Sequence, residues 1–284
     1  MIPNPLPIYS SVRAPINKLS TQDAPRVPPN PINLYGCKRA CDDFALLVKQ
    51  LGCDRIIILG HDWGGMVVWR MAQWYADLVT HVIVVCTSYA RPQKEYISIE
   101  QLVASGRAPQ FGYHLQLASP EVEHRIESAE DIRKFLHGMY GARGPNGETG
   151  FSVEKGLLFE NLDKIGRTPL LTDSEMDYYV SQYSRNGLHG IENWYRTRKA
   201  NWEDELDLIK TGRTKVEQPT LFIQATRDRV FTPATMVKMG ESIPKLTVKP
   251  VEANHWVLWE KPAECNAILE QWLKNIVLGS RSSL

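Results

Sequence analysis

Residues 56–65, Ile-Ile-Ile-Leu-Gly-His-Asp-Trp-Gly-Gly, decide the fold of this chain. The aliphatic run at the start predicts a short buried strand, and the segment 66–76 predicts a helix with apolar residues on one face. Gly60 and Gly64 bracket a tight turn with Asp62 at its apex. A strand that turns at once into a helix crowds the apex backbone, so residues without a bulky side chain are needed on either side. The pattern predicts a nucleophile elbow in which aspartate replaces the usual serine.

The carboxylate of Asp62 is expected at the N-terminus of the helix that follows the turn. Free N–H groups and the helix dipole favour an anion there, so we expect Asp62 to stay ionised and to face a pocket. The competing interpretation is an ordinary aspartate that caps the helix through its own side chain. The nucleophile is favoured, because the turn pattern is complete and partner residues follow downstream.

The composition of this 284-residue chain indicates one large domain or a domain with an insertion. Its 33 basic and 32 acidic residues leave a net charge of +1, which argues against binding to nucleic acid or a membrane surface through bulk charge. No apolar run is long enough to predict a membrane span. The first residues do not resemble a secretion signal, so we expect a cytoplasmic protein. The C-terminal Ser-Ser-Leu is only a weak match to the peroxisomal Ser-Lys-Leu signal.

The five cysteines are an odd number without the spacing of a disulfide framework. Cys86 lies in an apolar segment and Cys265 in a predicted helix, so buried free thiols are expected. Cys37 and Cys41 lie four positions apart on a predicted helix, but no second pair of ligands completes a zinc site. We therefore expect neither disulfides nor a structural metal.

The alternation of predicted elements indicates an α/β fold with a parallel sheet. Residues 1–35 are rich in proline and predict an irregular arm. The core is expected over 36–90 and 217–284, and it begins with an amphipathic helix at 36–51. Weaker periodicity predicts an inserted helical lid over 91–216. Strands are predicted at 56–60, 81–88, 219–225 and 246–251, and later helices at 233–243 and 262–277.

Two polar residues that follow predicted strands supply partners for the elbow. Asp228 follows the strand at 219–225, and His255 follows the strand at 246–251. Functional loops lie at the C-terminal edge of a parallel sheet, so both residues are expected near the apex. Taken singly, Asp228 is also typical of a turn or cap, and His255 of a surface or core histidine. The order nucleophile, acid, histidine is that of α/β hydrolases and predicts a triad with Asp62.

Several motifs resemble those of the epoxide hydrolases that have an α/β-hydrolase fold. Gly60-His-Asp-Trp-Gly-Gly65, Asp228 and Asn254-His-Trp256 resemble the elbow and the triad partners of that family. In the predicted lid, Asn193-Trp-Tyr-Arg196 resembles the segment that holds one of the family's two acidic tyrosines. Phe111-Gly-Tyr-His114 resembles the segment that holds the other. Haloalkane dehalogenases share the elbow motif, so the lid motif is the more specific part.

The resemblance covers residues 23–278 and implies an α/β-hydrolase fold with a reaction through a covalent ester. Attack by a carboxylate on an epoxide carbon leaves an ester that water can cleave, whereas attack by serine would leave a stable ether. The implied substrate is a small apolar epoxide and the implied product is a vicinal diol. No metal ion or organic cofactor is required, and no nucleic-acid or membrane partner is expected. The oligomeric state stays open.

The resemblance also implies a role for each matched residue. Asp62 opens the ring, while Tyr113 and Tyr195 hydrogen-bond the ring oxygen and supply its proton. His255, oriented by Asp228, then activates the water that cleaves the ester. Each tyrosine taken alone is equally typical of ordinary aromatic packing. Three further residues complete the predicted site: the oxyanion donor Trp63 and the substrate-binding residues Trp194 and His61.

The chain departs from the family pattern before residue 60. The family normally carries an early His-Gly-x-Pro loop that supplies a second oxyanion N–H, and no such motif occurs here. The family also places several strands before the helix at 36–51, and the proline-rich residues 1–35 do not encode them. We therefore expect an N-terminally truncated sheet with its elbow strand at an edge. Loss of one oxyanion donor costs on the order of 10² to 10³ in rate, so slow turnover of the ester is expected.

Two other functions stay open at the level of the sequence. A haloalkane dehalogenase would use the same Asp62 and His255, would stabilise a halide with ring N–H groups such as that of Trp63, and would not need the tyrosines. A non-catalytic α/β-hydrolase-like protein would bind an apolar ligand or a partner, and the truncated sheet is its best argument. Replacing both tyrosines by phenylalanine separates epoxide opening from halide release. Failure of both substrate classes to label Asp62 would favour the binding protein.

Overall fold

The computed structural model describes residues 31–278 of the chain. Most of the arm predicted over 1–35 therefore lies outside the described residues. Contacts divide the described chain into two compact units. Unit 1 holds residues 37–94 and 204–278, and unit 2 holds residues 31–36 and 95–203. Unit 2 overlaps the segment 91–216, whose role as a lid stays a prediction.

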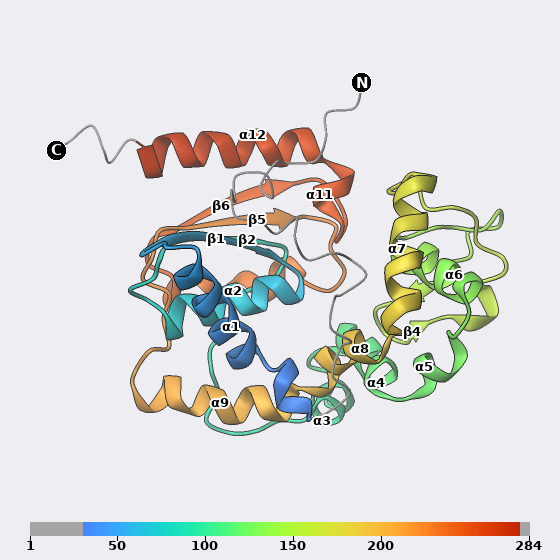
Figure 1. Cartoon of the computed structure of the whole chain (residues 1–284), viewed down its shortest axis with the longest axis horizontal. Coiled ribbons are helices and arrows are strands. Elements are labelled where there is room, and N and C mark those ends of the chain that lie inside the picture. The colour runs from blue at the N-terminus through green and yellow to red at the C-terminus, as the bar shows by residue number, and fades with distance from the viewer. Residues whose placement is uncertain (1–30, 279–284) are drawn as a thin grey trace. The chain divides into compact units, whose positions relative to one another are not determined.

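A parallel sheet forms the centre of unit 1 (Figure 1). Its strands are β1 (Ile56–His61), β2 (Val79–Val85), β5 (Thr220–Ala225) and β6 (Leu246–Val251). The strand order is β1-β2-β5-β6, so within the described residues the elbow strand β1 lies at an edge of the sheet, as the sequence predicts. Gly60 of β1 pairs with Val84 of β2, and Phe222 of β5 pairs with Val248 of β6. Because all strands are parallel, the residues that follow them meet at one edge of the sheet.

Strand β2 has different bounds from the predicted segment 81–88. It ends at Val85 because Cys86 has a φ of +66°, in the left-handed region that a strand does not continue through. The strand is buried on both faces. Ile83 and Val85 belong to the cluster that includes α12 (Pro262–Trp272), and Val84 contacts α2 (Trp63–Trp74) at Gly65. Burial on both faces explains why the strand is a continuous apolar run.

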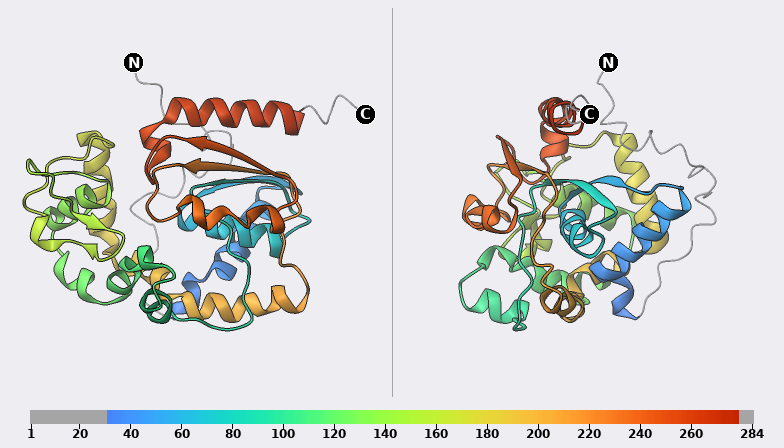
Figure 2. Two further views of the ribbon diagram at one scale, coloured as in Figure 1. Left: turned by 180° about the vertical axis from the view of Figure 1, so that it is seen from behind. Right: turned by 90° about the vertical axis from the view of Figure 1, so that its left-hand side faces the viewer.

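Helices cover both faces of this sheet (Figure 1 and Figure 2). α12 lies across one face, and α1 (Cys37–Gln50) and α2 lie across the other. α1 confirms the predicted helix at 36–51 and ends before Gly52, whose φ of +69° suits the end of a helix. The predicted helix at 262–277 also forms, but its last part is a π-helical segment, η7 (Leu273–Leu278).

Two other predicted helices have bounds that the structure corrects. The elbow helix α2 begins at Trp63 instead of residue 66, because it starts directly after the turn. The helix predicted over 233–243 is split into η6 (Pro233–Met236) and α10 (Met239–Ser242). The backbone of Lys238, with a φ of −103° and a ψ of 5°, interrupts the helical path between them. A short helix, α11 (Val257–Glu260), follows β6.

Unit 2 consists of short helices and a small antiparallel ribbon (Figure 1). The ribbon pairs β3 (Phe151–Ser152) with β4 (Gly156–Leu157). Two helix pairs pack together: α4 (Tyr113–Ala118) with α8 (His189–Arg196), and α6 (Ala129–Met139) with α7 (Asp173–Asn186). The other helices are η3 (Ile32–Tyr35), α3 (Ile99–Ala104), η4 (Pro109–Phe111), α5 (Glu121–Arg125), η5 (Phe159–Asn161) and α9 (Arg198–Lys210), which continues into unit 1.

The cysteines match the prediction from the sequence. Cys37, Cys41, Cys86 and Cys265 are buried free thiols, and Cys53 is an exposed free thiol. The prediction of free thiols instead of disulfides is therefore confirmed. Within residues 31–278, no helix combines the length and the apolar character that crossing a membrane requires.

Candidate active site

Asp62 stands at the junction of β1 and α2 in a conformation that suits a nucleophile elbow. Its φ of +54° and ψ of −125° lie in a region that residues with a side chain rarely adopt. Gly60 permits the turn, because a Cβ there would lie 2.2 Å from the Gly64 carbonyl oxygen. The sequence argument is wrong about Gly64 itself, where an added Cβ would meet no atom within 4 Å. The second constrained position is Gly65, where a Cβ would lie 2.8 Å from the Thr87 side chain.

The side chain of Asp62 is turned toward a histidine and does not cap α2. It makes no side-chain capping bond, and its Oδ1 lies 3.2 Å from His255 Nε2. The Trp63 backbone N–H donates to the same carboxylate. The Thr87 hydroxyl donates to the Asp62 carbonyl oxygen at 2.7 Å and so stabilises the turn. The interpretation of Asp62 as an ordinary helix cap is therefore wrong.

The structure brings the predicted acid and histidine to Asp62. His255 follows β6, and its Nδ1 lies 2.8 Å from Oδ2 of Asp228, which follows β5. Oδ1 of Asp228 accepts hydrogen bonds from the backbone N–H groups of Val230, at 2.7 Å, and Phe231, at 3.2 Å. Asp228 is 4% exposed, so these bonds fix the acid, and the acid fixes the orientation of the imidazole ring.

The two carboxylates hold a proton on His255. Burial alone would lower the pKa of His255, but hydrogen bonds and charges from Asp228 and Asp62 raise it to about 10. Burial alone would also raise the carboxyl pKa values, yet the contact with His255 keeps the pKa of Asp62 and that of Asp228 below their ordinary range. At neutral pH the site therefore contains an imidazolium between two carboxylates, and Asp62 is ionised as a nucleophile must be.

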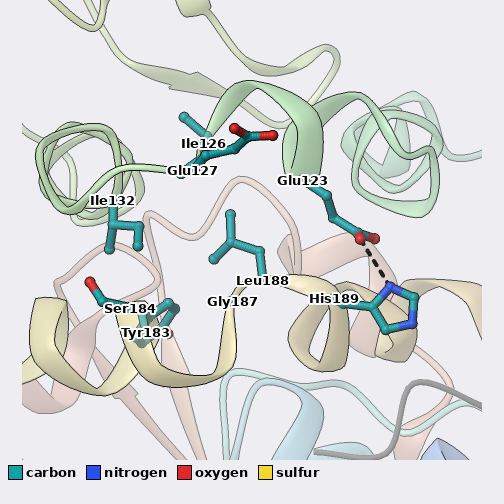
Figure 3. Close-up of a pocket in the computed structure, with 9 residues that line it drawn as sticks. All are labelled: Glu123, Ile126, Glu127, Ile132, Tyr183, Ser184, Gly187, Leu188 and His189. Atoms are coloured by element: carbon teal, nitrogen blue, oxygen red, sulfur yellow. Dashed lines mark hydrogen bonds and ion pairs between the residues drawn. The ribbon is translucent and has the colours of Figure 1, made fainter.

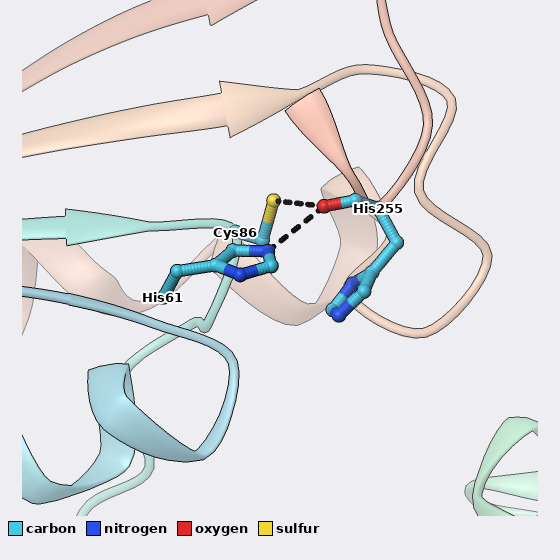
Figure 4. A group of neighbouring side chains, drawn as sticks. All are labelled: His61, Cys86 and His255. Carbon is cyan, nitrogen blue, oxygen red and sulfur yellow. Dashed lines mark hydrogen bonds between the residues drawn. The ribbon is translucent and has the colours of Figure 1, made fainter. Parts of the chain in front are cut away.

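His61 and Cys86 hold the backbone of His255 (Figure 4). The His255 carbonyl oxygen lies 2.8 Å from His61 Nε2 and accepts from Cys86 Sγ at 3.4 Å. Because a carbonyl oxygen only accepts, Nε2 of His61 carries the proton. Burial and the charge of His255 lower the pKa of His61 to about 4, so this ring is neutral at pH 7. His61 thus supports the histidine, and the substrate contact expected of it stays a prediction.

The same three residues, His61, Cys86 and His255, each offer a possible metal ligand, and these atoms lie within 4.8 Å of one another. Their geometry favours positioning over metal binding. Burial and the charge of Asp228 raise the pKa of the Cys86 thiol far above its ordinary value, so the thiol keeps its proton. The thiol and the His61 Nε2 both point at the His255 carbonyl oxygen (Figure 4). A metal ion would have to displace both of these hydrogen bonds.

Unit 2 brings the two predicted tyrosines together. The rings of Tyr113, at the start of α4, and Tyr195, near the end of α8, have centroids 5.9 Å apart and planes inclined at 76°. The ring of His114 packs edge-to-face with that of Tyr195, with ring centroids 5.0 Å apart. The ring of Phe151 packs edge-to-face with that of Tyr113, with ring centroids 5.4 Å apart. These edge-to-face contacts favour one arrangement of the phenols. The role of Trp194, which precedes Tyr195 on α8, stays a prediction.

Sequence reasoning gave no role to four residues that the structure places in supporting contacts. In unit 1 these are Cys86 and Thr87, which the sequence placed inside the predicted strand 81–88 and which follow the end of β2 in the structure. In unit 2 they are Arg196, the last residue of the Asn193–Arg196 motif, and Glu192, an acidic residue that is only 3% exposed. Many of their contacts, such as Thr87 with Asp62 and Arg196 with Ala118, are with residues distant in the sequence, so local patterns did not reveal them. The pair of Glu192 and Arg196 has the four-residue helical spacing and was the available local signal in unit 2.

Known proteins share sequence and fold with this chain. A family model described as the alpha/beta hydrolase fold matches residues 23–262. The chain belongs to the alpha/beta hydrolase fold family. A Neurospora crassa relative of this α/β hydrolase, named epoxide hydrolase srdG, is 33% identical over 252 residues, which cover 86% of the chain and 73% of the relative. The Mus musculus protein named bifunctional epoxide hydrolase 2 is 30% identical over 256 residues, which cover 88% of the chain but only 44% of that protein.

Solved structures share the fold of this α/β hydrolase. Epoxide hydrolase A from Mycobacterium thermoresistibile matches with a TM-score of 0.69 at 25% identity, over 87% of this chain and 78% of that one. Potato epoxide hydrolase I matches with a TM-score of 0.71 at 22% identity, over 88% and 79% of the two chains, and supports the fold alone. The α/β-hydrolase fold and the resemblance to epoxide hydrolases, both predicted from the sequence, are confirmed.

Proposed function

We propose that this α/β hydrolase is an epoxide hydrolase that opens a small apolar epoxide to a vicinal diol through an ester on Asp62. One observation carries the proposal: an ionised carboxylate, in place of a serine hydroxyl, stands on the elbow 3.2 Å from a histidine that a second carboxylate orients. A carboxylate suits attack on an sp³ carbon, because the resulting ester can be hydrolysed. The relatives' names and the tyrosine pair of unit 2 support the same reaction.

The first step of the proposed reaction forms the ester. An oxygen of the Asp62 carboxylate attacks an epoxide carbon, and the bond between that carbon and the ring oxygen breaks. The electron pair stays on the ring oxygen, which takes a proton from Tyr113 or Tyr195. The phenol that keeps its proton hydrogen-bonds the developing charge. The products are an uncharged ester, a free hydroxyl group on the substrate and one phenolate.

The second step requires His255 to lose its proton. Its pKa is about 10 because two carboxylates flank it, and esterification removes the charge of Asp62. The pKa of His255 therefore falls, and the proton it releases balances the proton that the phenolate takes up. The nucleophilic step thus prepares the base for the hydrolytic step.

Hydrolysis then regenerates the enzyme. Neutral His255 removes a proton from a water molecule whose oxygen attacks the carbonyl carbon of the Asp62 ester. In this proposal the Trp63 backbone N–H stabilises the oxyanion that forms, and its hydrogen bond to the Asp62 carboxylate in the resting site supports that role. Collapse of that intermediate breaks its bond to the substrate alcohol, and His255 returns the proton to the diol. The Asp62 carboxylic acid left by this step then gives its proton to His255, which restores the resting ion pair.

A single turnover in ¹⁸O-labelled water tests the covalent step. With enzyme in excess over styrene oxide, the first diol takes its new oxygen from Asp62, so the label is expected in the Asp62 peptide. Label in the first diol would mean direct attack by water and would refute the proposal.

His255→Gln is expected to trap an adduct of one epoxide mass on the Asp62 peptide, and Asp62→Ala is the matched control that carries none. Decay of the wild-type adduct measures whether turnover is slow, as expected from the sequence.

The same labelling separates the competing functions. The double change Tyr113→Phe and Tyr195→Phe is expected to abolish adduct formation with the epoxide. Labelling of Asp62 by a haloalkane, with halide release and no reaction with epoxides, would indicate a dehalogenase. No label from either class would favour a ligand-binding protein.

The proposal also covers the partners of the enzyme and its location in the cell. The nearly balanced charge of the chain supports a small-molecule substrate without a nucleic-acid or membrane partner. A cytoplasmic location is part of the proposal, and cell fractionation tests it against the peroxisomal alternative.

A further inference from the structure

One guanidinium ties together the two helices that carry the tyrosine pair. Arg196 directly follows Tyr195 at the end of α8. Its Nε donates to the Ala118 carbonyl oxygen at 2.8 Å, and its Nη2 donates to the Ser119 carbonyl oxygen at 3.1 Å. These carbonyls close the C-terminal end of α4, where a cation is favoured, and Tyr113 is the first residue of that helix. Arg196 therefore links α8, which carries Tyr195, to α4, which carries Tyr113.

Two acidic side chains hold the Arg196 guanidinium in turn. Glu192, one helical turn earlier on α8, places its Oε2 3.1 Å from Nη2, and Glu123 of α5 binds the same nitrogen. Asn193 accepts from Nη1 at 3.0 Å. Glu123 also pairs with His189 at 2.9 Å (Figure 3). Because Glu192 is 3% exposed, an imbalance of charge in this cluster is poorly screened by solvent.

Two carboxyl groups share one cation, and Glu192 is the one that stays uncharged. Burial raises the pKa of Glu192 to about 9, and the hydrogen bond and negative charge of Glu123 add to the rise. Burial opposes ionisation of Glu123 as well, but Arg196 and His189 hold its pKa below the ordinary value. At neutral pH the cluster therefore holds one guanidinium, one carboxylate and one neutral acid. A hollow of about 270 Å³ at the edge of this cluster is lined in part by Glu123 and His189 (Figure 3).

The carboxyl group of Glu192 leaves polar atoms unsatisfied. Among the described residues, Glu192 Oε1 and Asn193 Nδ2 have no hydrogen-bond partner. A buried polar atom without a partner is destabilising, and an apolar residue at position 192 would avoid the penalty of its own orphan atom. A destabilising acid three positions from Tyr195 indicates a use other than stability.

We propose that Glu192 is a positioning residue for the Tyr113–Tyr195 pair and acts through Arg196. The inference rests on the proposed function, in which this pair is the acid of the ring-opening step. While Glu192 is neutral, the guanidinium faces a single carboxylate and keeps its bonds to the end of α4. When Glu192 loses its proton, two buried carboxylates compete for Arg196, so those bonds weaken and the phenols separate.

The other groups near Glu192 are consistent with this titration. Charged partners come from α5 and from α8 itself, and α8 also packs against α4 and η3. No other carboxyl group lies on those two packed elements, whose sequences are YHLQLA and INLY. The titratable and charged groups to consider are Glu123, His189, Arg196, Tyr195, Tyr113, His114 and Tyr35.

The pH dependence of Asp62 alkylation tests the proposal. In the wild type, the single-turnover rate constant is expected to fall about tenfold between pH 8 and pH 10, the response to loss of one required proton. Glu192→Gln keeps the shape and a neutral donor, so it should keep the rate at pH 7 within about twofold and lose this fall. Glu127→Gln removes an exposed acid from the same unit and should keep the wild-type profile. An unchanged fall in Glu192→Gln would assign it to the phenols and overturn the proposal.

A readout that needs no epoxide separates this inference from the proposed function. Ring resonances of ¹³C-labelled tyrosine can be assigned with Tyr113→Phe and Tyr195→Phe. In the wild type, both resonances are expected to shift with a common midpoint near pH 9, and in Glu192→Gln this shift should be absent. These shifts decide the positioning role even if the chain opens no epoxide. Identical titrations in both proteins would refute the role of Glu192 while leaving the reaction intact.

Discussion

Replacing Asp62 by asparagine should convert His255 into a base at neutral pH. The asparagine side chain resembles the uncharged ester of the proposed intermediate, because both present a neutral carbonyl group at the same place. Asp228 stays 2.8 Å from His255 Nδ1 and continues to orient the ring. The variant therefore isolates the contribution of one negative charge to the pKa of His255.

The distance between the charged groups sets the magnitude. Asp62 Oδ1 lies 3.2 Å from His255 Nε2, and at an effective dielectric constant of about 20 two unit charges at that distance attract by about 5 kcal/mol. About 1.4 kcal/mol corresponds to one pH unit. Water at the partly exposed Asp62 reduces the effect, so the pKa of His255 should fall from about 10 by about two to four pH units. The fall has this sign because removing the anion destabilises only the protonated ring.

Nuclear magnetic resonance titration of the imidazole resonances measures this pKa in both proteins. His81, on β2 with its ring against Trp272, provides an internal control that should titrate alike in wild type and variant. Intact mass before and after the titration verifies that the new amide has not been hydrolysed to aspartate. A fall of less than one pH unit would refute the reasoning, because Asp228 alone would then hold the proton. Ester formation could not release the base in that case.

Three further predictions concern stability and can be checked by urea unfolding. Gly60→Ala should destabilise the fold by about 2–3 kcal/mol, because its Cβ would lie 2.2 Å from a backbone oxygen, whereas Gly64→Ala, which meets open space in a helix, should stabilise by about 0.5–1 kcal/mol. Equal effects of the two changes would contradict this account. Glu205→Leu leaves the buried guanidinium of Arg70 without the carboxylate 2.7 Å away and should cost about 3–5 kcal/mol, most of which the second change Arg70→Met should restore. The raised pKa of Glu192 contributes stability that is present at acid pH and is lost as the pH rises from about 5 toward 9. The stability of Glu192→Gln relative to the wild type should therefore increase by about 1.4 kcal/mol per pH unit in that window. A difference independent of pH would show that the folded chain does not keep this proton.

Local sequence patterns predicted the elements that carry the active site. The strands β1, β5 and β6 and the helix α1 lie where apolar runs and 3.6-residue periodicity indicate them, because burial of one face or of both faces is encoded residue by residue. The patterns failed where a single backbone conformation decides the outcome. The left-handed Cys86 ends β2 early, and Lys238 breaks the helix predicted over 233–243. Neither cysteine nor lysine is a residue type whose presence predicts these backbone conformations.

The sequence by itself determined which chemical groups stand at the ends of the strands: Asp62 on its turn, Asp228 and His255 after later strands, all on one edge because parallel strands end together. Only the tertiary structure decided what surrounds them. The His255 carbonyl meets His61 across 194 sequence positions and Cys86 across 169, and the charge of Asp62 keeps the imidazole protonated until an ester forms. Periodicity reports whether a side chain is buried, but hydrogen-bond partners and pKa values depend on atoms that come together only when the chain folds.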